Sequence, residues 1–89
     1  MKKFKNGMRP VHPGEILEKD FCRPNDIFCS ELAQSCGLPG EVVVAIYDER
    51  ASITPEVDKA FCKFFGTTEG FWLGLQEMYD LRVKEIENS

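Results

Sequence analysis

The stretch that most constrains the fold covers residues 29–46 and reads CSELAQSCGLPGEVVVAI. It predicts two short helices joined by a tight turn, the arrangement of a helix-turn-helix unit. Ala33 stands four residues before Gly37, so a small side chain lets the second helix approach while the glycine supplies the positive φ of the turn. Apolar or sulfur side chains occupy the positions that such a unit must bury: Leu32, Cys36, Leu38, Val43 and Ile46. This pattern concerns the scaffold alone.

The length and composition predict one small folded domain. The chain has 89 residues, of which 43% are hydrophobic, enough for a single compact core. No apolar run approaches the length of a membrane span, and the N-terminus lacks the apolar region of a signal peptide. We therefore expect a cytoplasmic protein that does not enter a membrane.

Charge is unevenly distributed along the chain. The formal net charge is −4, yet residues 1–11 contain Lys2, Lys3, Lys5 and Arg9 and no acid. We expect this segment to be a flexible basic arm, which either contacts phosphates or remains a solvated tail. The acidic remainder is unlike a typical nucleic-acid binder, in which a basic surface supplies most of the affinity.

The sequence offers no pattern for catalysis, a metal or a cofactor. The four cysteines, Cys22, Cys29, Cys36 and Cys62, include no C-x-x-C pair, so we expect free thiols that serve as core residues. His12 lacks a nearby nucleophile and is expected to cap a helix or pack against the core. Because paired carboxylates, nucleophile–base pairs and phosphate loops are also missing from the sequence, we expect no enzyme.

Five helices and no sheet follow from the periodicity and the local start and stop signals. The first helix is expected over residues 15–22, and the last over residues 69–86. The expected capping or starting residues of the four later helices are Asn25 or Asp26, Pro39, Thr54 with Pro55, and Thr67 or Thr68. Gly37 and Gly66 are expected to end the second and fourth helices.

The third helix is the least obvious of the five. Residues 42–44 are three valines, and propensity alone favours a strand there. We nevertheless predict a helix, because Pro39 is a favourable helix start and no second strand-like segment could satisfy the backbone of an isolated strand.

Three motifs together resemble one family. They read RPVHPGEIL at residues 9–17, Ile-Thr at residues 53–54, and FFGTTEGFWLGLQ at residues 64–76 followed by YDL at residues 79–81. The chain resembles the HigA antitoxins, also called virulence-associated protein I, within the Xre and λ-repressor-like helix-turn-helix proteins. The resemblance covers residues 8–83.

The resemblance implies an all-α, five-helix λ-repressor-like DNA-binding domain with a helix-turn-helix, here over residues 12–87 as one domain. It also implies a homodimer, binding to a double-stranded operator that controls a toxin–antitoxin operon, and neutralisation of a cognate HigB-like toxin that cleaves messenger RNA. No cofactor is implied.

Three stretches depart from the family pattern. Phe28 and Cys29 stand where the family's second helix begins with Ser-Gln, of which the Gln braces a phosphate. The third helix opens with GEVVVA at residues 40–45, where the family carries polar or basic residues. Residues 48–51 read DERA in place of Asn-Gly-Lys-Arg, so an arginine takes the lysine position and an alanine takes the arginine position.

These departures leave few groups that could contact DNA. Base edges are read mainly by Arg, Lys, Asn or Gln, and residues 26–50 carry five acids against one base. The expected phosphate contacts are Lys19, Arg23, Arg50, Ser30 and the N-terminal arm. The candidate DNA-binding residues are Cys29, Ser30, Pro39, Gly40, Glu41, Val44 and Arg50.

Two functions of different classes therefore stay open. The chain is either an operator-binding antitoxin, or a protein-binding module that kept the fold and lost operator binding. In the second case Val42 and Val44 form an apolar patch for a partner, unless both are buried in a variant core.

The last helix carries more apolar surface than one core face needs. We expect a dimer interface there, formed by Trp72, Leu75, Met78 and Tyr79. The alternative is that all four side chains pack within the chain.

Overall fold

The computed structural model describes residues 9–88, and within them it contains helices and no strand, as the sequence predicted. The first helix has an α-helical turn, α1, that continues into a wider π-helical segment, η2, so the described chain has five helices. The elements are α1 (Pro13–Ile16), η2 (Leu17–Cys22), α2 (Cys29–Cys36), α3 (Gly40–Tyr47), α4 (Pro55–Phe65) and α5 (Phe71–Glu87). None of these helices combines the length and apolar character needed to cross a membrane.

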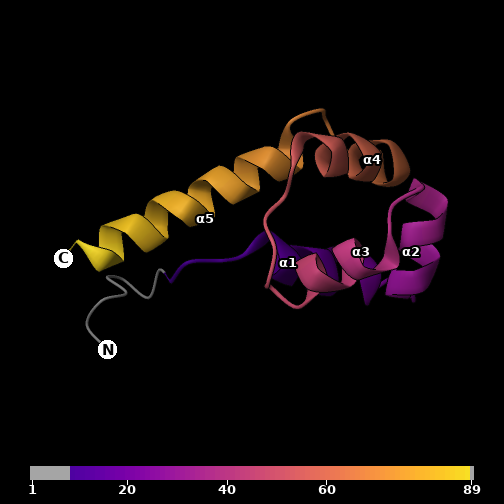
Figure 1. Cartoon of the computed structure of the whole chain (residues 1–89), viewed down its shortest axis with the longest axis horizontal. Helices are drawn as coiled ribbons and strands as arrows, with labels where there is room; N and C mark the ends of the chain where they lie inside the picture. Colours follow the sequence, from indigo (N-terminus) through magenta and orange to yellow (C-terminus); the bar gives the residue numbers. More distant parts are fainter. Residues whose placement is uncertain (1–8, 89) are drawn as a thin grey trace.

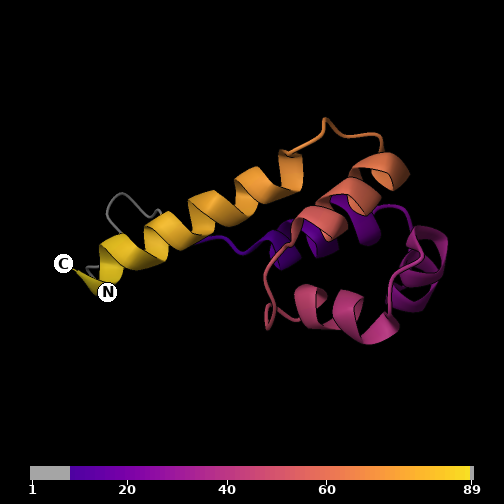
Figure 2. The ribbon, with the colours of Figure 1, turned by 45° about the horizontal axis from the view of Figure 1, so that its top comes forward.

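The first four helices form a compact body from which α5 extends (Figure 1). Helix α2 packs on α3 and on α4, whereas the first helix packs on α3 and α5. Only the N-terminal half of α5 lies against the body, and its C-terminal half projects away from it in both views (Figures 1 and 2). The body and the projecting helix give the molecule extents of 41 × 24 × 23 Å.

A single core joins all five helices. The side chains that are fully shielded from solvent include Leu17, Leu32, Val43, Ile46, Phe61 and Trp72. Trp72 is surrounded by the rings of Phe21, Phe61, Phe65 and Phe71, with ring centroids 5.1–5.9 Å from its own. The prediction that Trp72 belongs to a dimer interface is therefore wrong, because its whole surface is buried within the chain.

Several helix ends agree with the sequence signals. The Thr54 hydroxyl accepts a hydrogen bond from the backbone N–H of Val57 at 3.3 Å, at the start of α4. Gly37 and Gly66 adopt φ angles of 69° and 75° and end α2 and α4. The valine run lies in α3, so the prediction of a helix there is confirmed.

Other helix starts differ from the prediction. The first helix begins at Pro13, two residues earlier than expected, because His12 caps it. Helix α2 begins at Cys29 after Phe28, so neither Asn25 nor Asp26 caps it. The Asn25 side chain instead donates to the carbonyl of Phe21 at 2.8 Å, in the last turn of η2.

The start of α5 was also predicted wrongly. This helix begins at Phe71 without a threonine cap. Buried Asp58 on α4 performs that role, since its carboxylate accepts hydrogen bonds from the backbone N–H groups of Gly70, Trp72 and Leu73 at 2.9–3.1 Å. A carboxylate at this position satisfies the unpaired donors of the first turn and favours the positive end of the helix dipole.

Gly14 sets the distance between the first helix and α3. A Cβ atom built on Gly14 would lie 2.0 Å from the carbonyl oxygen of Ile46. Only glycine allows this approach, which explains the glycine of the HPGEIL motif in physical terms.

Candidate nucleic-acid interface

Helices α2 and α3 form the predicted helix-turn-helix. The backbone N–H of Leu38 donates to the carbonyl of Ala33 at 2.9 Å, which closes the turn around Gly37. Ala33 is buried at the contact of the two helices, and Pro39 leads directly into α3. The scaffold therefore has the form that presents the outer side of α3 to a groove of DNA.

The candidate DNA-binding residues lie on α2, on α3 and in the segments that border α3. Cys29 is half-buried, so its side chain belongs partly to the core. The exposed candidates are Ser30, Pro39, Gly40, Glu41, Val44 and Arg50.

The three valines of α3 have different environments. Val43 is fully buried and Val42 is half-buried against the core, whereas 38% of the surface of Val44 is exposed. The apolar patch that we considered from Val42 and Val44 is thus reduced to Val44 on α3. Phe28, at the start of α2, is 74% exposed.

Each expected cationic phosphate contact in the described chain is already paired with an acid. Ion pairs join Lys19 to Glu15 at 3.2 Å, Arg23 to Glu18 at 2.9 Å and Arg50 to Asp48 at 3.5 Å. These pairs are exposed on their cationic side, so each is weak and exchangeable. Lys2, Lys3 and Lys5 lie outside the described residues.

Two acidic side chains, Asp48 and Glu31, lie near the N-terminus of α2, where the family pattern has a glutamine that braces a phosphate. Burial raises the pKa of the Cys29 thiol, and the nearby Asp48 carboxylate adds to the effect. The backbone N–H of Phe28 donates to the Glu31 carboxylate at 3.4 Å. This N–H group at the start of α2 is therefore already paired with an acid of the chain itself. Both acids oppose a DNA phosphate at this position.

The remaining cysteines and His12 have structural roles. All four thiols are free, and burial raises the pKa of Cys22 to about 11. His12 is buried and its Nδ1 accepts a hydrogen bond from the backbone N–H of Gly14 at 2.9 Å, which confirms the predicted cap. Within residues 9–88 no group of His, Cys, Asp or Glu side chains is arranged to hold a metal ion.

Buried polar residues that the sequence analysis missed hold α5 and the segment after α3 in place. The Gln76 side chain accepts from the backbone N–H of Ile53 at 2.9 Å and donates to Asp80 at 3.0 Å. Each of the two buried residues Asp58 and Gln76 stands within, and interrupts, an apolar stripe of its own helix. Asp58 lies between Val57 and Phe61, and Gln76 lies between Trp72 and Tyr79. That interruption was the available signal.

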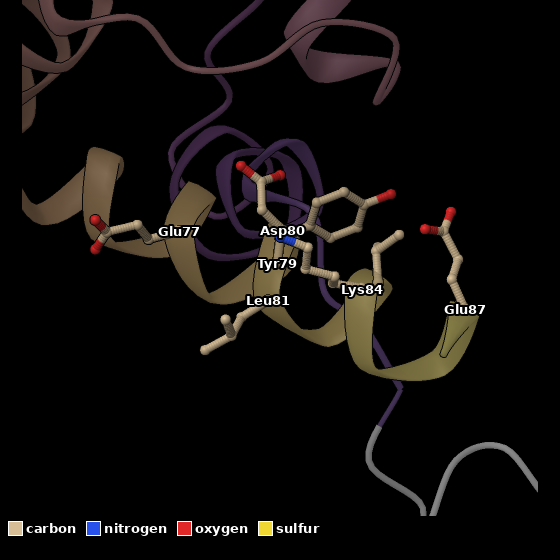
Figure 3. A pocket seen from close by; sticks show the side chains of 7 residues that line it. Glu77, Tyr79, Asp80, Leu81, Lys84 and Glu87 are labelled. Atoms are coloured by element: carbon tan, nitrogen blue, oxygen red, sulfur yellow. The ribbon is translucent and has the colours of Figure 1, made fainter. Parts of the chain in front are cut away.

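Three of the four candidate dimer residues remain accessible on α5. Met78 is 58% exposed, while Leu75 and Tyr79 are half-buried. The Tyr79 ring packs edge-on against His12 with centroids 4.9 Å apart. Figure 3 shows part of α5, where α5 residues alone line a hollow of about 430 Å³ that includes Tyr79 and Leu81.

This fold and this helix pair define a λ-repressor-like helix-turn-helix protein. No protein-family model matches the chain. Virulence-associated protein I of Dichelobacter nodosus is 31% identical over 81 residues, covering 91% of this chain and 75% of that protein. Antitoxin HigA-1 of Vibrio cholerae is 32% identical over 81 residues, covering 91% and 74%. The chain belongs to the HigA antitoxin family, in agreement with the resemblance seen in the sequence.

A solved structure agrees with this assignment. The Pseudomonas aeruginosa antitoxin HigA, solved with the higBA promoter, matches with a TM-score of 0.86 and 32% identity over 90% of this chain and 87% of that chain. The two HigA relatives are antitoxins, which are not enzymes, and this supports the expectation of a non-enzyme.

Proposed function

We propose that this chain is a HigA-type antitoxin that binds the operator of its own toxin–antitoxin operon and regulates its transcription. The observation that carries the proposal is the intact helix-turn-helix, in which Gly37 and Ala33 hold α3 with an outward, accessible face. A HigA relative of the same fold was solved with the promoter of its operon. As a member of this family, the chain also neutralises a HigB-like, mRNA-cleaving toxin.

The proposed operator contacts are the exposed groups around α3, together with the α2 N-terminus. The ion pair of Arg50 with Asp48 spans 3.5 Å between two largely exposed side chains, so Arg50 exchanges the carboxylate for a phosphate at little cost. The full set is Cys29, Ser30, Pro39, Gly40, Glu41, Val44 and Arg50.

The proposed active form is a homodimer that contacts its partner through Leu75, Met78 and Tyr79 on α5. A two-fold dimer presents two copies of α3 to the half-sites of a palindrome, so two weak contacts act as one binding event. Residues 12–87 act as one domain in this arrangement, and the basic segment of residues 1–11 adds phosphate contacts. The proposed site of action is the bacterial cytoplasm, where an operator and messenger RNA are both found.

The test is a binding isotherm of the full chain on the DNA upstream of its gene, repeated over a salt series. Operator binding predicts an affinity that falls steeply as salt increases, because phosphate contacts release counterions. A neighbouring gene for a small basic protein is the expected toxin gene, and co-purification of its product with this chain tests the antitoxin role.

A second candidate function is a protein-binding module without operator binding. The acids at the α2 N-terminus and the 74% exposed ring of Phe28 favour it, since a phosphate-binding surface needs neither. Absence of binding to the upstream DNA at low salt, together with retained toxin binding, would select this function over the first.

A further inference from the structure

Helix α3 presents two exposed side chains, those of Glu41 and Val44. The Glu41 carboxylate is exposed and forms no ion pair or hydrogen bond with another residue in the described part of the chain. Val44 is 38% exposed although its neighbours Val43 and Ile46 are fully buried. Glu41 and Val44 are three residues apart on a helix, which places their Cβ atoms about 5–6 Å apart on one face.

The helix backbone beside these two side chains is unobstructed. A Cβ atom built on Gly40 would meet nothing within 4 Å. The space beside Gly40 in the first turn of α3 is therefore open. Figure 2 shows α3 along one edge of the molecule, on the side away from α5. The first turns of such a helix fit the major groove of B-DNA, which is about 12 Å wide.

We infer that Glu41 and Val44 select a cytosine and a thymine, one or two base pairs apart, in the major groove of the operator. This inference rests on the proposed operator binding. A carboxylate accepts a hydrogen bond from the N4 amino group of cytosine, whereas guanine offers only acceptors and adenine places its N7 acceptor beside its amino group. The valine methyl groups contact the C5-methyl of thymine.

The spacing of the two side chains fits this assignment. Successive bases rise about 3.4 Å along the duplex, so a Cβ separation of about 5–6 Å spans one or two steps. Glu41 also repels the phosphates, which lowers the affinity for every sequence equally. Its effect therefore lies in the ratio of affinities between sequences, and the experiment compares sequences.

The experiment selects bound duplexes from a random pool with the full chain at low salt and compares the wild type with Glu41→Gln. Glutamine makes two hydrogen bonds to adenine, so the preference at one position should change from cytosine to adenine by roughly 5- to 100-fold. Glu69→Gln is the matched control, because it removes the same charge in the turn between α4 and α5, far from α3 (Figures 1 and 2). It should select the same sequences as the wild type.

The thymine contact is tested by replacing the selected thymine with uracil, which lacks only the methyl group. The wild type should bind the uracil duplex about fourfold more weakly, and Val44→Ala should bind both duplexes equally. Identical base preferences for the wild type and Glu41→Gln, or equal affinity of the wild type for both duplexes, would overturn the inference. A pool from which no duplex is retained would overturn operator binding as well.

Discussion

At the scale of single residues, the contact of Gly14 with the carbonyl of Ile46 is the tightest constraint on the fold. A Cβ atom there would lie 2.0 Å from a backbone oxygen, and backbone cannot move aside as a side chain does. We expect Gly14→Ala to lower the free energy of unfolding by about 3 kcal/mol or more, measured by urea denaturation. Gly74→Ala is the control, since nothing lies within 4 Å of the added atom. Within α5 that change should stabilise by about 0.5–1 kcal/mol.

A second residue-scale prediction concerns Glu49, which adopts a φ of 62°. This left-handed conformation strains a residue that bears a Cβ atom, and Glu49 stands where the family loop carries glycine. We expect Glu49→Gly to raise the free energy of unfolding by about 1 kcal/mol. Glu49→Ala removes the same charge without relieving φ, so an equal gain in both variants would assign the effect to charge instead.

At the scale of elements, Asp58 couples α4 to α5. Its carboxylate accepts three backbone N–H groups and is buried, so its removal leaves those donors unpaired. We expect Asp58→Ala to lower the free energy of unfolding by about 3 kcal/mol and Asp58→Asn to lower it less, because an amide keeps one acceptor oxygen. Asp20→Ala, at an exposed site of η2, is the control and should change stability little. Equal small losses at both sites would contradict the capping role.

This cap illustrates which parts of the fold the sequence could predict. Thr54 and Gly66 act on their own helix, and their signals predicted both ends of α4. Asp58 accepts hydrogen bonds from residues that lie 12–15 positions further along the chain, so no local pattern identifies its target. Trp72 shows the same difficulty in the core, because helical periodicity cannot distinguish a stripe that faces the core from one that faces a partner.

The candidate interface was predictable to a similar degree. The helical period correctly placed Glu41 and Val44 on the exposed side of α3 and Val43 on the buried side. The pairing of Lys19 with Glu15 and of Arg23 with Glu18 was not predicted. A four-residue spacing on an α-helix brings the first pair together, whereas the five-residue spacing of the second pair depends on the π-helical segment η2.

At the scale of the whole molecule, His12 joins three parts of the chain. It caps the first helix, packs on Tyr79 of α5 and lines the same hollow as Ala51 in the segment after α3. Burial lowers the pKa of His12 below its ordinary value of 6.5 although Glu49 and Asp80 oppose the shift. Between the lowered pKa and 6.5 the unfolded chain binds a proton that the folded chain does not, so stability falls as the pH decreases through this range.

His12 is the only histidine in the sequence, which makes this pH dependence measurable. We expect the unfolding midpoint in urea to decrease between pH 7.5 and pH 5.5, and to decrease less in His12→Asn, because asparagine caps a helix without titrating. Glu15, which stands three residues from His12, stays ionised in this range, because Arg9 and Lys19 lower its pKa to about 2. An identical pH dependence in the variant would contradict the assignment to His12.

The projecting half of α5 is the feature of the whole molecule that a single chain leaves unexplained. Met78 and Leu81 expose 58% and 57% of their surface, and within residues 9–88 no other helix lies beside the C-terminal half of α5 (Figures 1 and 2). If a second copy covers this surface, a charge at its centre must be buried without a partner when the dimer forms. We expect Met78→Glu to halve the molecular mass in light scattering while the helical circular dichroism is retained. Tyr79 is a poorer test site, because it also supports His12.

Phe64→Glu is the control for this prediction. It makes the same kind of change on α4 at a side chain that is 39% exposed, and it should leave the mass of the dimer unchanged. A Met78→Glu variant with the mass of the wild type would exclude this face of α5 as the interface, and equal dissociation of both variants would point to a general loss of stability instead.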